Sequence, residues 1–110
     1  MSEKEREAFF SRVRTNLLKH CSPLKIIIFG SYARGTQTAS SDLDVALLFR
    51  TEEEAETAKK TVLSQPPLTG IATDYLFLTE QRYNERKNFG GACVSIAAEG
   101  VTIFEAAHDS

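Results

Sequence analysis

Two carboxylates open an otherwise apolar segment, and this pairing restricts what the chain can fold into. Asp42 and Asp44 lie two positions apart, and residues 45–49 are all apolar, which is typical of a buried strand. Because side chains alternate along a strand, both carboxylates project from one face. Carboxylates this close repel each other unless a cation lies between them, and Mg²⁺ is commonly held by one or two carboxylates together with substrate phosphates. The spacing therefore predicts a metal site at the first residues of a strand.

A second apolar segment ends in a turn suited to an anion. Residues 26–29 are Ile-Ile-Ile-Phe, and Gly30 and Ser31 follow them. Glycine lets the backbone approach a ligand closely, and Ser31 adds a hydroxyl and an N–H group. For Arg34 two interpretations stay open: its guanidinium binds phosphate oxygens, or it braces the turn by pairing with a carboxylate.

A third acidic residue interrupts a later apolar segment. Asp74 lies within residues 71–78, which otherwise have the character of a strand. A carboxylate in a buried strand is costly unless it is paired or bound to a metal. The sequence therefore favours Asp74 as a third metal ligand. The alternative is an Asp74 at a strand edge, either in solvent or bonded to a neighbour such as Arg82.

These residues together resemble a known signature. The pair Gly30-Ser31, ten intervening residues and then Asp42-x-Asp44 is similar to the signature of nucleotidyltransferases of the DNA polymerase beta superfamily. The form Gly-Ser-Tyr-Ala-Arg-Gly and the small size resemble the minimal nucleotidyltransferases (MNT) of the antitoxin type. The resemblance implies a polymerase beta-like nucleotidyltransferase fold and a third acidic residue on the next strand, which agrees with Asp74.

The resemblance also implies an activity and its partners. It implies nucleotidyl transfer that depends on two Mg²⁺ ions, with ATP as the nucleoside triphosphate. In the minimal group the enzyme is an antitoxin that transfers AMP to a HEPN-domain protein, here to one of its hydroxyl groups. The residues expected to act are Asp42, Asp44 and Asp74 as catalytic and metal-binding residues, and Gly30, Ser31 and Arg34 as nucleotide-binding residues.

Three other hypotheses stay open. The first is a non-catalytic module that masks a HEPN-type toxin without modifying it. The second is the catalytic subunit of an enzyme that modifies a small molecule, as aminoglycoside nucleotidyltransferases do. The third is structural, with Asp42 and Asp44 merely capping a strand. The intact Gly30, Ser31, Asp42 and Asp44 argue against a decayed, non-catalytic site.

Length and composition fit one small domain over residues 1–110. With 42% hydrophobic and 25% charged residues, the chain resembles an ordinary soluble domain. A net charge of −2 provides no basic field for a nucleic-acid backbone, which disfavours a nucleic-acid partner. No apolar segment approaches the ~20 residues of a membrane span, so we expect a cytoplasmic protein. We expect the acceptor site to come from another chain, a self-association surface or the acceptor protein itself.

Capping and periodicity signals predict an α/β fold with a small mixed sheet of three to four strands, flanked by helices mainly on one side. Ser2 with Glu5 and Thr51 with Glu54 form capping boxes. The loop at 35–41 is too short for a crossover helix, so the strands beside it are expected to run antiparallel. The expected helices cover about residues 3–19, 52–64, 80–88 and 92–99, and the expected strands cover 24–29, 42–49, 71–78 and 101–104.

Turn signals and several side chains complete the sequence-based expectations. Gln65-Pro66-Pro67 is expected to form a linker, Gly100 to end the last helix as its C′ residue, and the polar tail around His108 to fray. Tyr32 can stack on a base or ribose, or pack on the sheet. Three cations can meet the triphosphate or a partner, or stay solvated: Arg82, Arg86 and Lys87.

Overall fold

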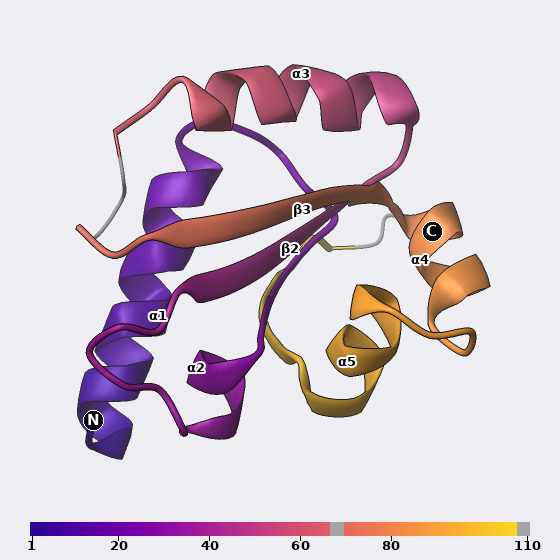
Figure 1. The fold of residues 1–110 in the computed structure, drawn as a ribbon. Coiled ribbons are helices and arrows are strands. Elements are labelled where there is room, and N and C mark those ends of the chain that lie inside the picture. Colours follow the sequence, from indigo (N-terminus) through magenta and orange to yellow (C-terminus); the bar gives the residue numbers. More distant parts are fainter. Residues whose placement is uncertain (67–69, 108–110) are drawn as a thin grey trace.

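The order of helices and strands follows the sequence prediction, with one further short helix at residues 31–34 (Figure 1). The structure is a computed structural model that describes residues 1–66 and 70–107, so the predicted linker at 65–67 is only partly covered and His108 lies outside. Within these residues no helix is long and apolar enough to span a membrane. The elements are α1 (Glu3–Leu18), β1 (Lys25–Phe29), α2 (Ser31–Arg34), β2 (Leu43–Phe49), α3 (Glu52–Leu63), β3 (Thr73–Thr79), α4 (Glu80–Arg86), α5 (Ala92–Glu99) and β4 (Val101–Glu105).

One mixed sheet organises the described part of the chain, with four strands in the order β3-β2-β1-β4. The strand β1 runs antiparallel to β2, which confirms the expectation drawn from the short loop between them. It also runs antiparallel to β4, whereas β2 and β3 are parallel. Parallel neighbours need a crossover connection, and α3 provides it. The predicted α/β fold with a mixed sheet is confirmed.

The sheet carries a core on each face, because alternate residues of its strands point in opposite directions. On one face, Val45 and Leu47 pack with α1 and α3. On the other, Ala46 and Leu48 pack with Ile96 of α5, and α4 contributes to the same cluster. The expectation that helices cover mainly one side is therefore wrong. The sequence pattern marks α5 as apolar but does not say which face of the sheet it covers.

The helix α1 begins as its capping signal predicted. The Ser2 hydroxyl accepts a hydrogen bond from the Glu5 N–H at 3.1 Å, and the Glu5 carboxylate accepts one from the Ser2 N–H at 3.1 Å. Its buried side chains include Val13 and Leu17, which are fully inaccessible. In α3 the Thr51 hydroxyl accepts a hydrogen bond from the Glu54 N–H at 3.1 Å, which is one of the two bonds of the predicted capping box. Both predicted helix starts are confirmed.

Gly100 ends α5, but for a different reason from the one predicted. Its φ is −65° and its ψ is 143°, so the residue is extended rather than left-handed, and the expected C′ geometry is wrong. What glycine provides here is space. A Cβ at this position would collide with the Ile96 carbonyl oxygen and lie 2.6 Å from Cγ2 of Ile27. The end of α5 therefore approaches β1 closely.

We expect Gly100→Ala to lower the free energy of unfolding by about 1–3 kcal/mol, because the added methyl group overpacks the contact with Ile27. Urea denaturation followed by circular dichroism measures this change. The control is Ala98→Ser, at an exposed position of the same helix, where the change should stay below about 0.5 kcal/mol. Equal effects of the two exchanges would contradict the close approach of α5 and β1.

Candidate active site

The predicted acidic residues gather along one edge of the sheet, which is formed by the last residue of β1 and the first residues of β2 and β3. The strand register pairs Phe29 with Asp44, and Asp44 with Asp74. Neighbours in register share a face of the sheet, so Asp44 and Asp74 project to the same side. Asp42 lies immediately before β2, close enough for its charge to act on Asp44. The edge thus brings Asp74 beside the pair Asp42 and Asp44, which precede it by about 30 residues in the sequence, on the face that α4 and α5 cover further along.

The electrostatics of Asp44 show that these carboxylates act on one another. Partial burial raises the pKa of Asp44, and the negative charges of Asp74 and Asp42 raise it further. The Arg34 guanidinium acts in the opposite direction and lowers the pKa of Asp44. The cluster therefore carries an excess of negative charge, and among the described residues Arg34 is the cation that offsets it at Asp44.

Gly30 supports this cluster through the close approach of its backbone. Its φ is 73° and its ψ is −152°, a conformation that residues with a side chain rarely adopt. A Cβ at Gly30 would also collide with the carboxylate of Asp44. The sequence-based role for this glycine was close approach to a ligand, and the structure shows a close approach to Asp44.

The helix α1 fixes α2, and part of this support was missed by sequence analysis. Arg6 donates a hydrogen bond from Nη2 to the carbonyl oxygen of Ala33 at 2.7 Å, and its guanidinium lies over the ring of Phe10. The ring of Phe9 lies 5.5 Å from that of Tyr32, which is buried. Of the two interpretations of Tyr32, packing is confirmed. Arg6 gave no signal, because it stands among charged residues and its partner is distant in the sequence.

The loop before Asp42 is held by its own side chains. The hydroxyl of Ser41 accepts a hydrogen bond from the Thr38 N–H at 2.8 Å, and the Ser41 N–H donates to the Thr38 carbonyl at 3.1 Å. Within the described residues, neither the Ser31 hydroxyl nor the Asp42 carboxylate has a hydrogen bond or ion pair to the protein. Both groups therefore retain their full capacity to bind a ligand.

The partners of Arg34 and Arg82 decide between the alternatives that the sequence left open for Arg34 and for Asp74. Arg34 pairs with Glu99 at 2.8 Å, so its bracing role is present, while half of its side chain remains exposed. Arg82 pairs with Glu52 at 2.7 Å and not with Asp74. Asp74 is exposed, and in the described part of the chain its side chain forms no ion pair or hydrogen bond. The alternative of an Asp74–Arg82 pair is therefore wrong, whereas the alternative of an Asp74 in solvent on an edge strand agrees with its position. The premise that Asp74 lies in a buried strand is wrong, because β3 is an outer strand of the sheet.

The donor set fits a hard cation, although it does not form a closed metal site. Among the described residues, no group of three His, Cys, Asp or Glu side chains is positioned to hold a metal ion. Carboxylates with no cation between them repel each other and favour separated positions. Their oxygens are nevertheless the ligands that Mg²⁺ prefers. The glycine at position 30 also leaves space for the Asp44 carboxylate, because it has no Cβ. The roles of Asp42, Asp44 and Asp74 as metal ligands stay a prediction.

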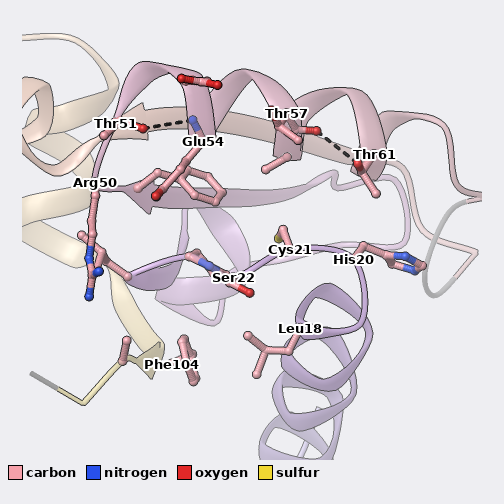
Figure 2. A pocket seen from close by; sticks show the side chains of 16 residues that line it. Leu18, His20, Cys21, Ser22, Arg50, Thr51, Glu54, Thr57, Thr61 and Phe104 are labelled. Carbon is pink, nitrogen blue, oxygen red and sulfur yellow. Dashed lines mark hydrogen bonds between the residues drawn. The ribbon is translucent and has the colours of Figure 1, made fainter. Parts of the chain in front are cut away.

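Two cavities of the described residues lie away from the candidate active site. A cavity of about 920 Å³ lies at the opposite end of the sheet, between α3, the end of α1 and the strand end at Phe104 (Figure 2). A smaller one of about 570 Å³ shares Leu24 and Arg50 with it. Neither of these cavities is lined by Ser31 or by the three aspartates.

Comparison with known proteins gives a family match. The family model described as nucleotidyltransferase domain matches residues 10–94, a range that contains every predicted site residue. No curated protein matches the chain in sequence.

Solved structures share the fold at low sequence identity. A crystal structure of a toxin–antitoxin with AMP-PNP is 16% identical with a TM-score of 0.57, and the match covers 88% of this chain and 73% of the other. A mutant of the toxin–antitoxin MntA-HpeT, with two aspartates replaced by glutamates, is 14% identical with a TM-score of 0.57 and the same coverage. A proposed nucleotidyltransferase from Sulfolobus solfataricus is 19% identical with a TM-score of 0.56, covering 92% and 85%.

The raised pKa of Asp44 predicts a stability that depends on pH. A carboxyl whose pKa is raised on folding stabilises the protein below its unfolded pKa, about 4, and loses this contribution as the pH rises through the folded value. At a pH above the folded pKa, and in the absence of divalent cations, the Asp44→Asn variant should therefore be more stable than the wild type. We expect up to about 1 kcal/mol after allowance for solvent screening, or a few degrees in Tm.

Thermal unfolding in EDTA between pH 4 and pH 8 measures this difference, which should shrink toward pH 4. The matched control is Glu56→Gln on the exposed surface of α3, where no such trend is expected. An Asp44→Asn protein that is less stable than the wild type at pH 7 would show that the carboxylates do not crowd one another.

Gly30→Ala should lower the free energy of unfolding by about 1–3 kcal/mol, because it combines a strained φ with the collision against Asp44. Gly35→Ala is the control, since Gly35 also has a positive φ but open space around its Cα. Chemical denaturation of both, and of Gly30→Ala in an Asp44→Ala background, separates strain from collision. The contact is refuted if removal of the Asp44 carboxylate does not reduce the cost of Gly30→Ala.

Proposed function

The chain belongs to the nucleotidyltransferase domain family, and from this premise we propose that it transfers AMP from ATP to a hydroxyl group of a partner protein. The observation that carries the proposal is the pairing of Asp44 with Asp74 across neighbouring strands, beside the turn at Gly30 and Ser31. One edge of the sheet thus presents carboxylates for a cation and a turn for an anion. Nucleotidyl transfer requires both.

The three carboxylates Asp42, Asp44 and Asp74 are the residues that would hold two Mg²⁺ ions. Bound ions of this kind stabilise charge on phosphoryl oxygens and lower the pKa of an acceptor hydroxyl. The excess negative charge at Asp44 favours cation binding, since a cation relieves the repulsion from Asp42 and Asp74.

The remaining site residues bind the nucleotide and move one proton. Ser31 and the backbone after Gly30 donate hydrogen bonds to triphosphate oxygens, and the half-exposed Arg34 offsets their charge. The exposed Asp74 accepts the proton of the acceptor hydroxyl. The acceptor oxygen then forms a bond to the α-phosphorus, the bond from this phosphorus to the bridging oxygen breaks, and pyrophosphate leaves.

Two structural neighbours support the nucleotide and the kind of partner. One toxin–antitoxin structure contains AMP-PNP, an ATP analogue, and another carries a mutation of two aspartates two positions apart, the spacing of Asp42 and Asp44. Together with the resemblance to the antitoxin-type minimal group, they favour ATP as substrate and a HEPN-domain toxin as acceptor. The open edge at Asp74 suits an acceptor that approaches on the surface of another protein.

We expect the protein to transfer label from α-labelled ATP to a HEPN-type partner in the presence of Mg²⁺, and EDTA to abolish the transfer. The double exchange Asp42→Asn/Asp44→Asn should reduce the rate at least about 100-fold, since even residues that only support metal ligands can be worth 10–100-fold. Glu53→Gln, an exposed carboxylate on α3, is the control and should leave the rate unchanged.

The same assay distinguishes the other hypotheses. Transfer only to a small molecule would favour a small-molecule nucleotidyltransferase. Tight binding of the partner without transfer, unaffected by the aspartate exchanges, would favour a masking module and refute the proposed activity.

A further inference from the structure

An ion pair joins the end of α5 to the short helix α2. Oε1 of Glu99 accepts a hydrogen bond from Nη1 of Arg34 at 2.8 Å, although the residues are 65 positions apart in the sequence. The Glu99 side chain is 27% exposed and that of Arg34 is 48% exposed. A pair this exposed normally contributes little to stability, so its energy alone does not explain the arrangement. Its location at the edge with the three aspartates suggests a role in the site.

The ion pair occupies only part of the Arg34 guanidinium. A guanidinium carries five N–H donors in a rigid plane, and among the described residues only Nη1 of Arg34 has a side-chain or backbone acceptor. The rest of the group can still meet an anion. Arg34 also acts on Asp44, whose pKa it lowers, so its charge already reaches the carboxylates.

Glu99 is itself well placed to hold another side chain. It is the last residue of α5, and the following Gly100 donates a hydrogen bond to the Ile96 carbonyl at 2.9 Å. Gly100 leaves no room for a Cβ against Ile27, and Ile96 is buried in the core on this face. The carboxylate of Glu99 therefore projects from a helix end that is packed tightly on β1.

We propose that Glu99 is a positioning residue, which holds Arg34 at the edge of the sheet so that its free N–H groups meet the phosphates of a nucleoside triphosphate. The inference rests on the proposed function and deepens it. An arginine loses considerable rotamer freedom when it binds a phosphate, and a brace that restricts it beforehand lowers this cost. The opposite role, in which Glu99 competes with phosphate for Arg34, predicts the opposite change in affinity.

Exchanges at Glu99 test this role through the affinity for Mg-ATP, measured by calorimetry. Glu99→Ala removes the brace and should raise the Kd about three- to tenfold. Glu99→Gln keeps an oxygen acceptor for Arg34 and should stay within about twofold of the wild type. In the transfer assay the effect of Glu99→Ala should appear in the KM for ATP, with kcat nearly unchanged. In an Arg34→Ala background, Glu99→Ala should have no further effect.

A matched control comes from another exposed ion pair, Glu52 with Arg82. Glu52→Ala removes the partner of Arg82, which lies at 2.7 Å, and should leave the Kd unchanged. Tighter binding by Glu99→Ala, or unchanged binding while the wild type binds normally, overturns this inference alone. Failure of the wild type to bind Mg-ATP overturns the proposed function together with it. The Tm of each variant shows whether a weaker affinity reflects lost positioning or a poorly folded protein.

Discussion

The contact between the backbone of Gly30 and the carboxylate of Asp44 is the constraint on which the rest of the site depends. It follows from the antiparallel register of β1 and β2, which sets Phe29 opposite Asp44 and so brings the next residue against the carboxylate. A residue with a Cβ would have to move either the turn or the aspartate. The glycine therefore couples the turn at Ser31 to the acidic strand, so that a shift of one displaces the other.

This coupling stabilises a cluster that is unfavourable in the absence of a cation. Partial burial and the like charges of Asp74 and Asp42 raise the pKa of Asp44, and the packing of the following strand residues offsets the cost of this cluster. Val45, Ala46, Leu47 and Leu48 are fully inaccessible and pack on both faces immediately after the site. A rigid and well-buried strand can thus present carboxylates in a position that they would not adopt on a flexible loop. The apolar residues of β2 thus stabilise the fold, and its first residues form the candidate site.

Most of the fold followed from local signals in the sequence, because caps and hydrophobic periodicity depend on neighbouring residues. The start of α1, the limits of α5 and the antiparallel pairing across the short loop were predicted in this way. Contacts between distant elements were not. The bond from Arg6 to Ala33, the pair of Arg34 with Glu99 and the steric role of Gly100 each depend on how helices pack on the sheet. For the candidate site, the sequence identified the acidic residues, whereas their supports required the structure.

The position of Asp74 indicates how a complete site would be assembled. The strand β3 is an outermost strand of the sheet, and Asp74 is exposed near the start of that strand. The two cavities described above lie at the other end of the sheet, so neither of them encloses an acceptor beside the carboxylates. Transfer reactions need water to be excluded from the reacting groups. An acceptor protein, as proposed above, would supply a covering surface that excludes water from these carboxylates.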